Sequence, residues 1–236
     1  ALATKLGDDI VLGADVKSVE RTAAGLRVVF DRGGERSAVD CDRVLLAVPS
    51  TVVDRIDLTK ALSADKRAAV TAIGATSVTR LWAQTSRRPW LERGESATAD
   101  TDLPIGRVQD EVEGIEGPSG ILSIYLSGAK ARHFAAMDDW KRVPAALLDL
   151  ERVHPGTRER FLVGASQVWD EAPYARGGYA WFAPEQLTAF GGTRWAPEGG
   201  IHFAGCHTSH RPGFMHGALA SARRAVREIV AASAEV

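Results

Sequence analysis

The fold of this chain is decided by residues 202–229, HFAGCHTSHRPGFMHGALASARRAVREI. They predict a short strand that ends at Gly205, a polar loop, and a helix over residues 215–232. Gly213 and Gly217 leave the backbone accessible on both sides of the point where the helix begins. The first N–H groups of a helix lack partners, and the helix dipole adds partial positive charge there. The segment therefore favours contact with a negatively charged group, although similar segments more often serve only as connections.

The predicted terminal helix is amphipathic. Its apolar side chains recur at helical spacing, which predicts a stripe buried against the core. This stripe consists of Leu219, Ala222, Val226 and Ile229. The solvated side is expected to carry Arg223, Arg224 and Arg227.

Upstream, runs rich in Val, Ile and Leu at residues 10–19, 26–30 and 43–48 predict a strand, a hairpin and a buried strand. Gly25 and a turn at Gly33-Gly34 are expected to punctuate these runs. A helix is expected from Ser63 to about Ile73, with Ser63 as its N-cap. The region that follows reads as a mixed sheet with one helix. Its expected strands cover 76–86, 105–109, 121–126 and 161–169, and its expected helix covers 138–153.

This order of elements predicts an α/β fold in two parts. Residues 1–75 and 176–236 are expected to form one part, and residues 76–175 the other. With 45% hydrophobic and 25% charged residues, the composition is that of an ordinary soluble globular protein. The net charge of −1 gives no general attraction to nucleic acid or anionic lipid. No apolar run approaches the roughly 20 residues that span a bilayer.

Two cysteines, Cys41 and Cys206, are too few for a disulfide framework. We expect free thiols in a protein of a reducing compartment, by default the cytoplasm. Four histidines gather in the terminal segment, but no second set of ligands accompanies them, so no metal site is expected. They are His202, His207, His210 and His216.

Residues 202–229 resemble the terminal flavin-binding signature of the flavin-containing amine oxidases, the family of monoamine, polyamine and many L-amino-acid oxidases. That signature has a Phe-Ala-Gly strand end, a Thr-Ser loop, a Gly-aromatic-Met-(Glu or His)-Gly turn and a helix of small residues. Upstream segments follow the family's order, so the resemblance covers essentially the whole chain. They are Asp15-Val16-Lys17, Ala47-Val48-Pro49 and the block VWDEAPYARGGY at 168–179.

The resemblance implies FAD as the cofactor. Val16 would contact the adenine, and Gly205 and Cys206 would lie along the ribityl-pyrophosphate chain. Gly213 and Met215 would form the turn at the flavin ring, with the Met215 N–H directed at the N1–C2=O edge. Reduction places negative charge on that edge, and a helix N-terminus stabilises it without a proton transfer.

The resemblance also implies a substrate site. Tyr179 and Phe214 would be paired rings that flank the substrate amine and exclude water while a hydride leaves. Trp169 would pack beside this cage and the flavin, and Trp181 would line the cavity. Arg80 stands where many members have a lysine that holds a water near flavin N5. Arginine keeps the charge but does not deprotonate, so oxidase and dehydrogenase chemistry both stay open. The alternative is that the aromatic residues are plain core.

One departure from the family concerns the cofactor's pyrophosphate. No GxGxxG follows a strand anywhere in the chain. We therefore expect a partial FAD-binding Rossmann-like (glutathione-reductase-type) domain, over 1–75 and 176–236, beside a mixed-sheet substrate domain over 76–175. A second polypeptide that carries GxGxxG would complete it in a hetero-oligomer, for example α2β2. Members with a covalent flavin have a cysteine where Gly178 stands, so FAD is expected to be non-covalent.

The implied activity is oxidation of an amine or amino acid at its C–N bond to an imine, with oxygen reduced to hydrogen peroxide (EC 1.4.3-type). The chain would be active only with its partner. Two alternatives stay open: a flavin desaturase or dehydrogenase of specialised metabolism, and a non-catalytic structural subunit. A substrate carboxylate would need an arginine, for which the candidates are Arg80, Arg107, Arg132 and Arg176.

Overall fold

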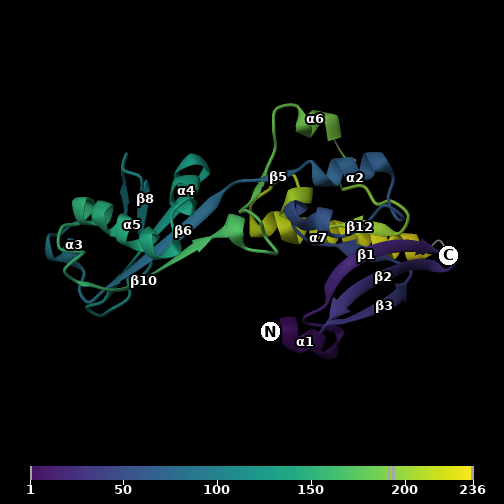
Figure 1. The fold of residues 1–236 in the computed structure, drawn as a ribbon, viewed down its shortest axis with the longest axis horizontal. Helices are drawn as coiled ribbons and strands as arrows, with labels where there is room; N and C mark the ends of the chain where they lie inside the picture. Colours follow the sequence, from purple (N-terminus) through teal and green to yellow (C-terminus); the bar gives the residue numbers. More distant parts are fainter. Residues whose placement is uncertain (1, 191, 193–194, 235–236) are drawn as a thin grey trace. The chain divides into compact units, whose positions relative to one another are not determined.

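The computed structural model describes residues 2–190, 192 and 195–234 of this chain. It divides into two compact units, Ala1–Ala75 with Tyr179–Val236 and Thr76–Gly178 (Figure 1). Both units combine helices with strands, which confirms the predicted α/β class. The assignment of FAD to the first unit and of substrate to the second stays a prediction. Among the described residues, no helix is long and apolar enough to cross a membrane.

The first unit begins with a short helix and an antiparallel sheet. The helix α1 (Leu2–Leu6) and the 3-10 turn η1 (Gly7–Asp9) precede the sheet, so the strand predicted from residue 10 begins only at Asp15. The sheet has the order β1 (Asp15–Thr22), β2 (Gly25–Arg32), β3 (Glu35–Cys41). Gly33 and Gly34 form the predicted turn, and their φ angles of 60° and 87° lie where glycine is favoured.

A second, parallel pair of strands joins distant parts of the chain. The strand β4 (Val44–Leu46) pairs with β12 (Ile201–Phe203), and Ala204 N donates to Leu46 O at 2.9 Å. Parallel strands are normally buried on both faces, and all three residues of β12 are at most 4% exposed. The other elements of the first unit are η2 (Ser50–Arg55), α2 (Ala64–Thr71), β5 (Gly74–Ala75), β11 (Ala180–Trp181), α6 (Gln186–Phe190), η4 (Cys206–Thr208) and α7 (Met215–Ala234). Ser63 caps α2 as predicted, because its side chain accepts a hydrogen bond from Lys66 N at 3.2 Å.

The predicted buried stripe of α7 is wrong. The helix instead buries its small residues Gly217, Ser221 and Ala225, while Leu219 is 65% and Val226 is 52% exposed. The reason is the close packing of α7 against β12 and η4, which leaves room only for small side chains. The apolar stripe lies on a neighbouring face of the helix, which points away from these elements.

Arg224 is also not solvated as predicted. It is half-buried, and its guanidinium donates to the carbonyl oxygens of Phe203 at 2.8 Å and Trp195 at 3.2 Å. It also forms an ion pair with Glu228 at 2.8 Å. Arg224 therefore ties α7 to Phe203, the last residue of β12.

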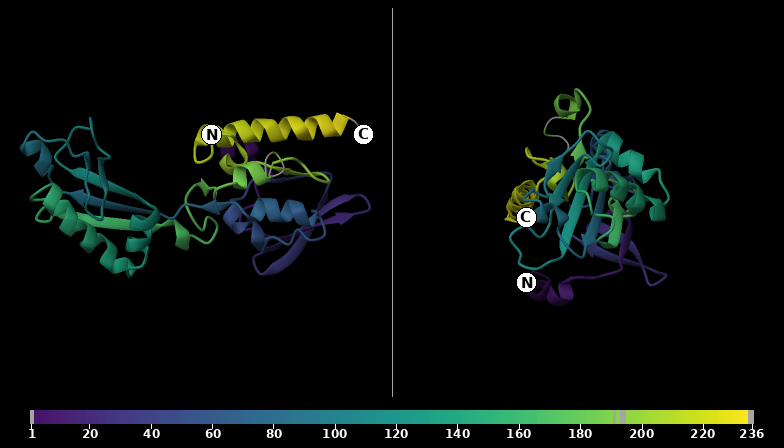
Figure 2. Two further views of the ribbon diagram at one scale, coloured as in Figure 1. Left: turned by 90° about the horizontal axis from the view of Figure 1, so that it is seen from above. Right: turned by 90° about the vertical axis from the view of Figure 1, so that its left-hand side faces the viewer.

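The second unit is a five-stranded antiparallel sheet covered by helices. Its strand order is β10 (Phe161–Val168), β6 (Val78–Thr85), β9 (Gly120–Ser127), β8 (Arg107–Asp110), β7 (Ala99–Asp100). The helices are α3 (Pro89–Glu92), α4 (Gly128–Ala135) and α5 (Asp139–Val153), and the 3-10 turn η3 (Trp169–Glu171) follows β10. Both α4 and α5 pack on β6 (Figure 2). The sequence predicted only one helix here, because α4 is short and buries only Ala131 and Phe134.

His154 makes the stability of the second unit depend on pH. The side chain is 3% exposed, its Nε2 lies 2.8 Å from Ala97 O, and its ring lies 5.6 Å from that of Trp90. Burial lowers the pKa of His154 below 6.5, so the unfolded chain binds a proton that the folded unit does not. Its contribution to stability is therefore present above pH 6.5 and is lost as the pH falls through the lower folded pKa.

We expect the urea midpoint of the second unit to fall between pH 7.5 and pH 5.5. In His154→Asn this histidine-dependent part of the fall disappears, although the variant is less stable at pH 7.5 because the buried contacts change. Replacement of the exposed His133 by Asn leaves the pH dependence unchanged. An equally steep pH dependence in His154→Asn and in the unaltered chain would contradict this assignment. Urea titrations followed by circular dichroism at the two pH values give the midpoints.

Candidate functional site

The predicted turn at the start of α7 has an open helix N-terminus. Gly213 has a φ of 85°, and Phe214 and Met215 are 63% and 85% exposed. The first backbone bond into the helix runs from Ala218 N to Phe214 O at 3.2 Å. Within the described residues, the N–H groups of Met215, His216 and Gly217 have no hydrogen-bond partner. Such a helix end offers donors and partial positive charge to a ligand.

Tyr179 lies directly against this turn. A Cβ placed on Gly213 would be 3.2 Å from the Cβ of Tyr179 and 3.4 Å from its Cγ. Tyr179 is 39% exposed, so its ring is not part of the core. Tyr179 therefore lies beside the residue that precedes Phe214, and the pairing of the two rings in a cage stays a prediction. The ring contact recorded for Phe214 is with His216, on which it stacks at 5.4 Å between ring centroids.

Trp181 lies on the same segment as Tyr179, in the short strand β11. It pairs with Gly74 of β5 and is 54% exposed. Tyr174, in the second unit, is 66% exposed. The alternative that these aromatic residues form plain core is therefore not supported for Tyr174, Tyr179 or Trp181.

The end of β12 is held by α7. Gly205 has a φ of 126°, and its N–H donates to Ser221 Oγ at 2.9 Å. Its carbonyl oxygen accepts from Thr208 N, also at 2.9 Å. Cys206, half-buried with a free thiol, begins the turn η4 that follows. Ser221 is a residue that the sequence analysis missed, and its spacing of four residues from Gly217 is the signal that could have revealed it.

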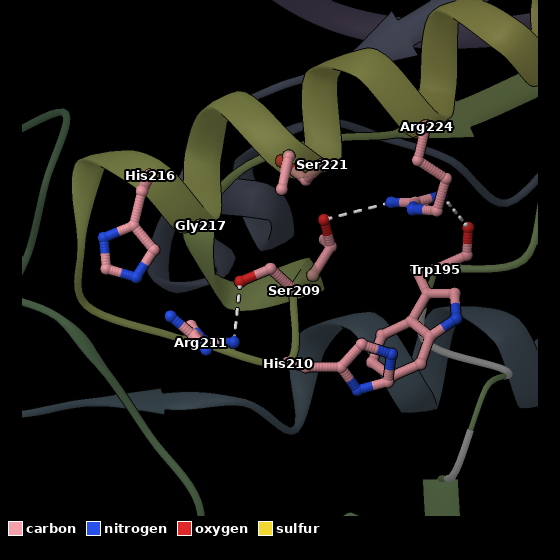
Figure 3. Close-up of a pocket in the computed structure, with 10 residues that line it drawn as sticks. Trp195, Ser209, His210, Arg211, His216, Gly217, Ser221 and Arg224 are labelled. Carbon is pink, nitrogen blue, oxygen red and sulfur yellow. Dashed lines mark hydrogen bonds between the residues drawn. The ribbon is translucent and has the colours of Figure 1, made fainter.

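A pocket of about 340 Å³ lies between η4 and the first turns of α7 (Figure 3). Its lining is basic and aromatic: Trp195, Thr208, Ser209, His210, Arg211, His216, Gly217, Ala220, Ser221 and Arg224. The rings of Trp195 and His210 meet edge to face at 5.2 Å. Ser209 Oγ accepts a hydrogen bond from Arg211 N at 3.1 Å, which joins two residues of the lining (Figure 3). In the described part of the chain, the histidines and acidic residues form no group that could hold a metal ion.

The remaining predicted FAD contact of the first unit is Val16. It lies in β1 opposite Phe30, beside the irregularity in pairing between Val16 and Ser18. The side chain is half-buried. Its contact with adenine stays a prediction.

Arg80, in β6 of the second unit, already has polar and aromatic partners within that unit. Its guanidinium donates to Glu111 Oε1 at 3.0 Å and to Ser123 Oγ at 3.3 Å. It also lies over the rings of Trp82 and Tyr125, at 5.2 and 5.5 Å. These contacts fix the side chain and offset its charge. Glu111 is therefore a second residue that sequence reasoning missed, since only the pairing of β8 with β9 brings it to Arg80.

The pairing of Arg80 with Glu111 bears on the candidates for binding a substrate carboxylate. Arg107 is likewise 3.5 Å from Asp100. Both arginines already face a carboxylate, which weakens their candidacy. Arg132, at the exposed side of α4, and Arg176, with a φ of 50°, are the other two candidates.

Trp169 belongs to the second unit, where it opens η3 and is 40% exposed. Its carbonyl oxygen accepts from Gly177 N at 2.9 Å, which folds the block at 169–177 back on itself. The next residue, Gly178, has no room for a side chain. A Cβ there would lie 2.3 Å from Val78 Cγ2 and 3.2 Å from Thr76 O. A cysteine that could bond covalently to a flavin is therefore excluded at Gly178 without a shift of Val78.

The donor groups of the first unit fit a flavin. The open N–H groups of Met215 to Gly217 suit an electron-rich ring edge, and Gly205 and Gly213 adopt conformations that keep the backbone accessible. The basic pocket beside them suits an anionic group of the same ligand.

A comparison with protein families identifies the class. The model of the flavin containing amine oxidoreductases matches residues 1–230. The chain therefore belongs to this family, and the resemblance and the flavin as the family's cofactor are confirmed.

Individual relatives support the same family. The chain is 26% identical over 239 residues to an L-amino-acid oxidase of Demansia vestigiata, covering 99% of this chain and 46% of the relative. It is 29% identical to an L-amino-acid oxidase of Siganus canaliculatus, covering 97% and 45%. The chain thus spans about half the length of the curated relatives it matches.

Solved structures show the same fold. Wild-type putrescine oxidase bound to putrescine is 27% identical, with a TM-score of 0.83 over 98% of this chain and 51% of that chain. Cyclohexylamine oxidase from Brevibacterium oxydans is 20% identical, with a TM-score of 0.83 over 97% and 50%. The latter supports the fold alone.

Proposed function

We propose that this chain is one part of an FAD-dependent oxidoreductase that converts an amine or amino acid to an imine, with oxygen reduced to hydrogen peroxide. One observation carries the proposal: Tyr179 packs against Gly213, next to the open N-terminus of α7. This places a half-exposed aromatic ring beside unpaired backbone donors in a chain of the amine oxidoreductase family.

The chain's own residues have distinct tasks in this proposal. The flavin, when bound, supplies the hydride acceptor. The N–H groups of Met215, His216 and Gly217 would offer hydrogen-bond donors and partial positive charge to the electron-rich edge of the flavin. Tyr179 and Phe214 hold the amine and exclude water, and Trp181 lines the cavity. No general base is assigned to this chain, because a substrate amine that binds neutral needs none.

The proposal includes a partner and a setting. A second polypeptide with GxGxxG supplies the pyrophosphate loop, in a hetero-oligomer of which α2β2 is one form, and the assembly works in the cytoplasm. Relatives named as L-amino-acid oxidases and as putrescine oxidase support amino acids and amines as the two substrate classes.

We expect the assembled protein to be yellow and to release all its FAD when precipitated with acid, because glycine stands at 178 and a linking cysteine has no room there. The absorbance of the supernatant gives the reading. Colour that stays in the pellet contradicts non-covalent binding.

We expect kcat/KM to rise as the pH is raised through the substrate's ammonium pKa, since only the neutral amine reacts. Peroxide formation at subsaturating substrate gives the reading. A flat pH profile contradicts a neutral amine.

A dehydrogenase is the second candidate function. Arg80 is held by Glu111 and two rings, so it differs in both reach and proton transfer from the lysine that many family members have there. Turnover with an artificial electron acceptor, without peroxide in air, would favour this candidate.

A further inference from the structure

Met215, the first residue of α7, is an exposed methionine. It is 85% exposed, the highest value among the large apolar residues that the structure describes. Met137, the other methionine of the chain, is half-buried and packs against the core of the second unit. An oxidant has to reach the sulfur before it can react with it. Met215 is therefore the more reactive of the two methionines.

The two free thiols are less open to an oxidant than this thioether. Cys41 and Cys206 are both half-buried. Burial also raises the pKa of the Cys41 thiol, so that less of the reactive thiolate is present. In the described part of the chain, the sulfur that is most open to an oxidant is therefore that of Met215.

The position of Met215 makes its chemical state important for a ligand at the start of α7. The backbone N–H groups of Met215, His216 and Gly217 have no hydrogen-bond partner within the described residues. Side chains of a helix lean toward its N-terminus, so that of Met215 leans toward this open end. The thioether is only a weak acceptor, and it leaves these donors to the ligand.

The proposed function supplies an oxidant for this sulfur. Hydrogen peroxide transfers one oxygen atom to the thioether. The S–O bond forms, the O–O bond breaks, the sulfur loses two electrons, and the remaining oxygen leaves as water. The product is methionine sulfoxide, which replaces an apolar group with a strongly polar one.

A sulfoxide at Met215 competes with the flavin for the same donors. Its oxygen carries partial negative charge, which the positive end of the helix dipole attracts. An oxygen acceptor on a side chain at the start of a helix takes up N–H groups of the first turn, as a capping residue does. Oxidised Met215 therefore withdraws hydrogen bonds from the ligand, and flavin binding becomes weaker.

We propose that Met215 is oxidised to the sulfoxide by the hydrogen peroxide that the enzyme itself releases, and that the sulfoxide weakens flavin binding at the start of α7. This inference rests on the proposed function, which supplies the peroxide. It adds a modification site, and it makes the activity self-limiting because each turnover produces the oxidant.

Peptide mapping of the assembled protein tests the modification. One sample receives putrescine and the common L-amino acids in air, with or without catalase, and a second sample receives hydrogen peroxide alone. Mass spectrometry gives the sulfoxide content at Met215 and at Met137. We expect Met215 to be oxidised at least about tenfold faster than Met137 in both samples. Catalase is expected to abolish the modification in the first sample.

The FAD affinity of the deflavinated assembly tests the consequence. Peroxide is expected to raise the dissociation constant at least about fivefold, since hydrogen bonds and the favourable helix end are lost to the ligand. Methionine sulfoxide reductase restores the affinity. In Met215→Leu, which has no sulfur at this position, peroxide changes the dissociation constant less than about 1.5-fold. Met137→Leu is the matched control, and it responds to peroxide as the unaltered protein does.

The possible outcomes separate this inference from the proposed function. Equal oxidation of the two methionines, or an unchanged FAD affinity once Met215 is fully oxidised, overturns the inference. Peroxide that accumulates during turnover while Met215 stays unmodified refutes the inference alone. If no substrate gives peroxide but added peroxide still oxidises Met215 and weakens FAD binding, the proposed function and the source of the oxidant are refuted.

Discussion

Replacement of Tyr179 by alanine is expected to lower kcat/KM for the substrate amine about 100-fold in the assembled flavoenzyme. The side chain lies against Gly213, the residue before Phe214, so its loss opens one side of the proposed cage. Water then enters, and the amine is no longer held in line with its hydride acceptor. Misplacement by about 1 Å is enough for a loss of this size. Steady-state rates with a panel of amines and amino acids provide the measurement.

Two control variants separate a role in the cage from a general effect of aromatic residues. Tyr179→Phe keeps the ring and is expected to retain activity within about threefold, because the proposed role needs no hydroxyl. Tyr174→Ala removes a side chain that is 66% exposed in the other unit, and turnover is expected to stay within about twofold. FAD content is measured in every variant. If Tyr179→Ala binds FAD and turns over at the normal rate, the chain is better explained as a non-catalytic structural subunit.

The local features of the first unit were predictable because they depend on short stretches of sequence. The Ser63 cap and the Gly33-Gly34 turn each need only a few neighbouring residues, and both are confirmed. The helix begins at Met215 as predicted, and the strand β12 lies where it was expected but ends at Phe203, two residues before Gly205. The terminal motif therefore predicted both the family and the strand and helix that flank the candidate site.

Contacts between distant segments were not predictable in the same way. The periodicity of α7 shows which residues are apolar, but not which face of the helix packs against β12. Small residues occupy that face because the backbones approach closely. The contact of Arg80 with Glu111 depends on the register of β8 with β9, across an irregular loop. The sequence of either segment alone contains no signal for it.

Replacement of Gly217 by alanine is expected to weaken FAD binding at least tenfold, with little change in thermal stability. Alanine favours a helix by about 1 kcal/mol over glycine, which stabilises α7. Its Cβ, however, would lie 2.2 Å from the carbonyl oxygen of Arg211 and 2.6 Å from Ser209 Oγ. Overpacking of this kind costs about 1–3 kcal/mol, so the two effects largely offset each other in the free energy of unfolding.

For FAD binding, in contrast, the clash with Arg211 is expected to be unfavourable with no offsetting gain. The oxygen of Arg211 belongs to the backbone, so the loop before Gly213 has to move, and the turn that presents the N–H groups of Met215 moves with it. A tenfold loss corresponds to about 1.4 kcal/mol of binding free energy. Gly74→Ala is the matched control, because its Cβ would meet Trp181 at an ordinary 3.6 Å, and its FAD affinity is expected to stay within twofold. Fluorescence titration of the deflavinated assembly gives both dissociation constants. If Gly217→Ala binds FAD as tightly as the unaltered protein does, the turn before α7 does not hold the cofactor.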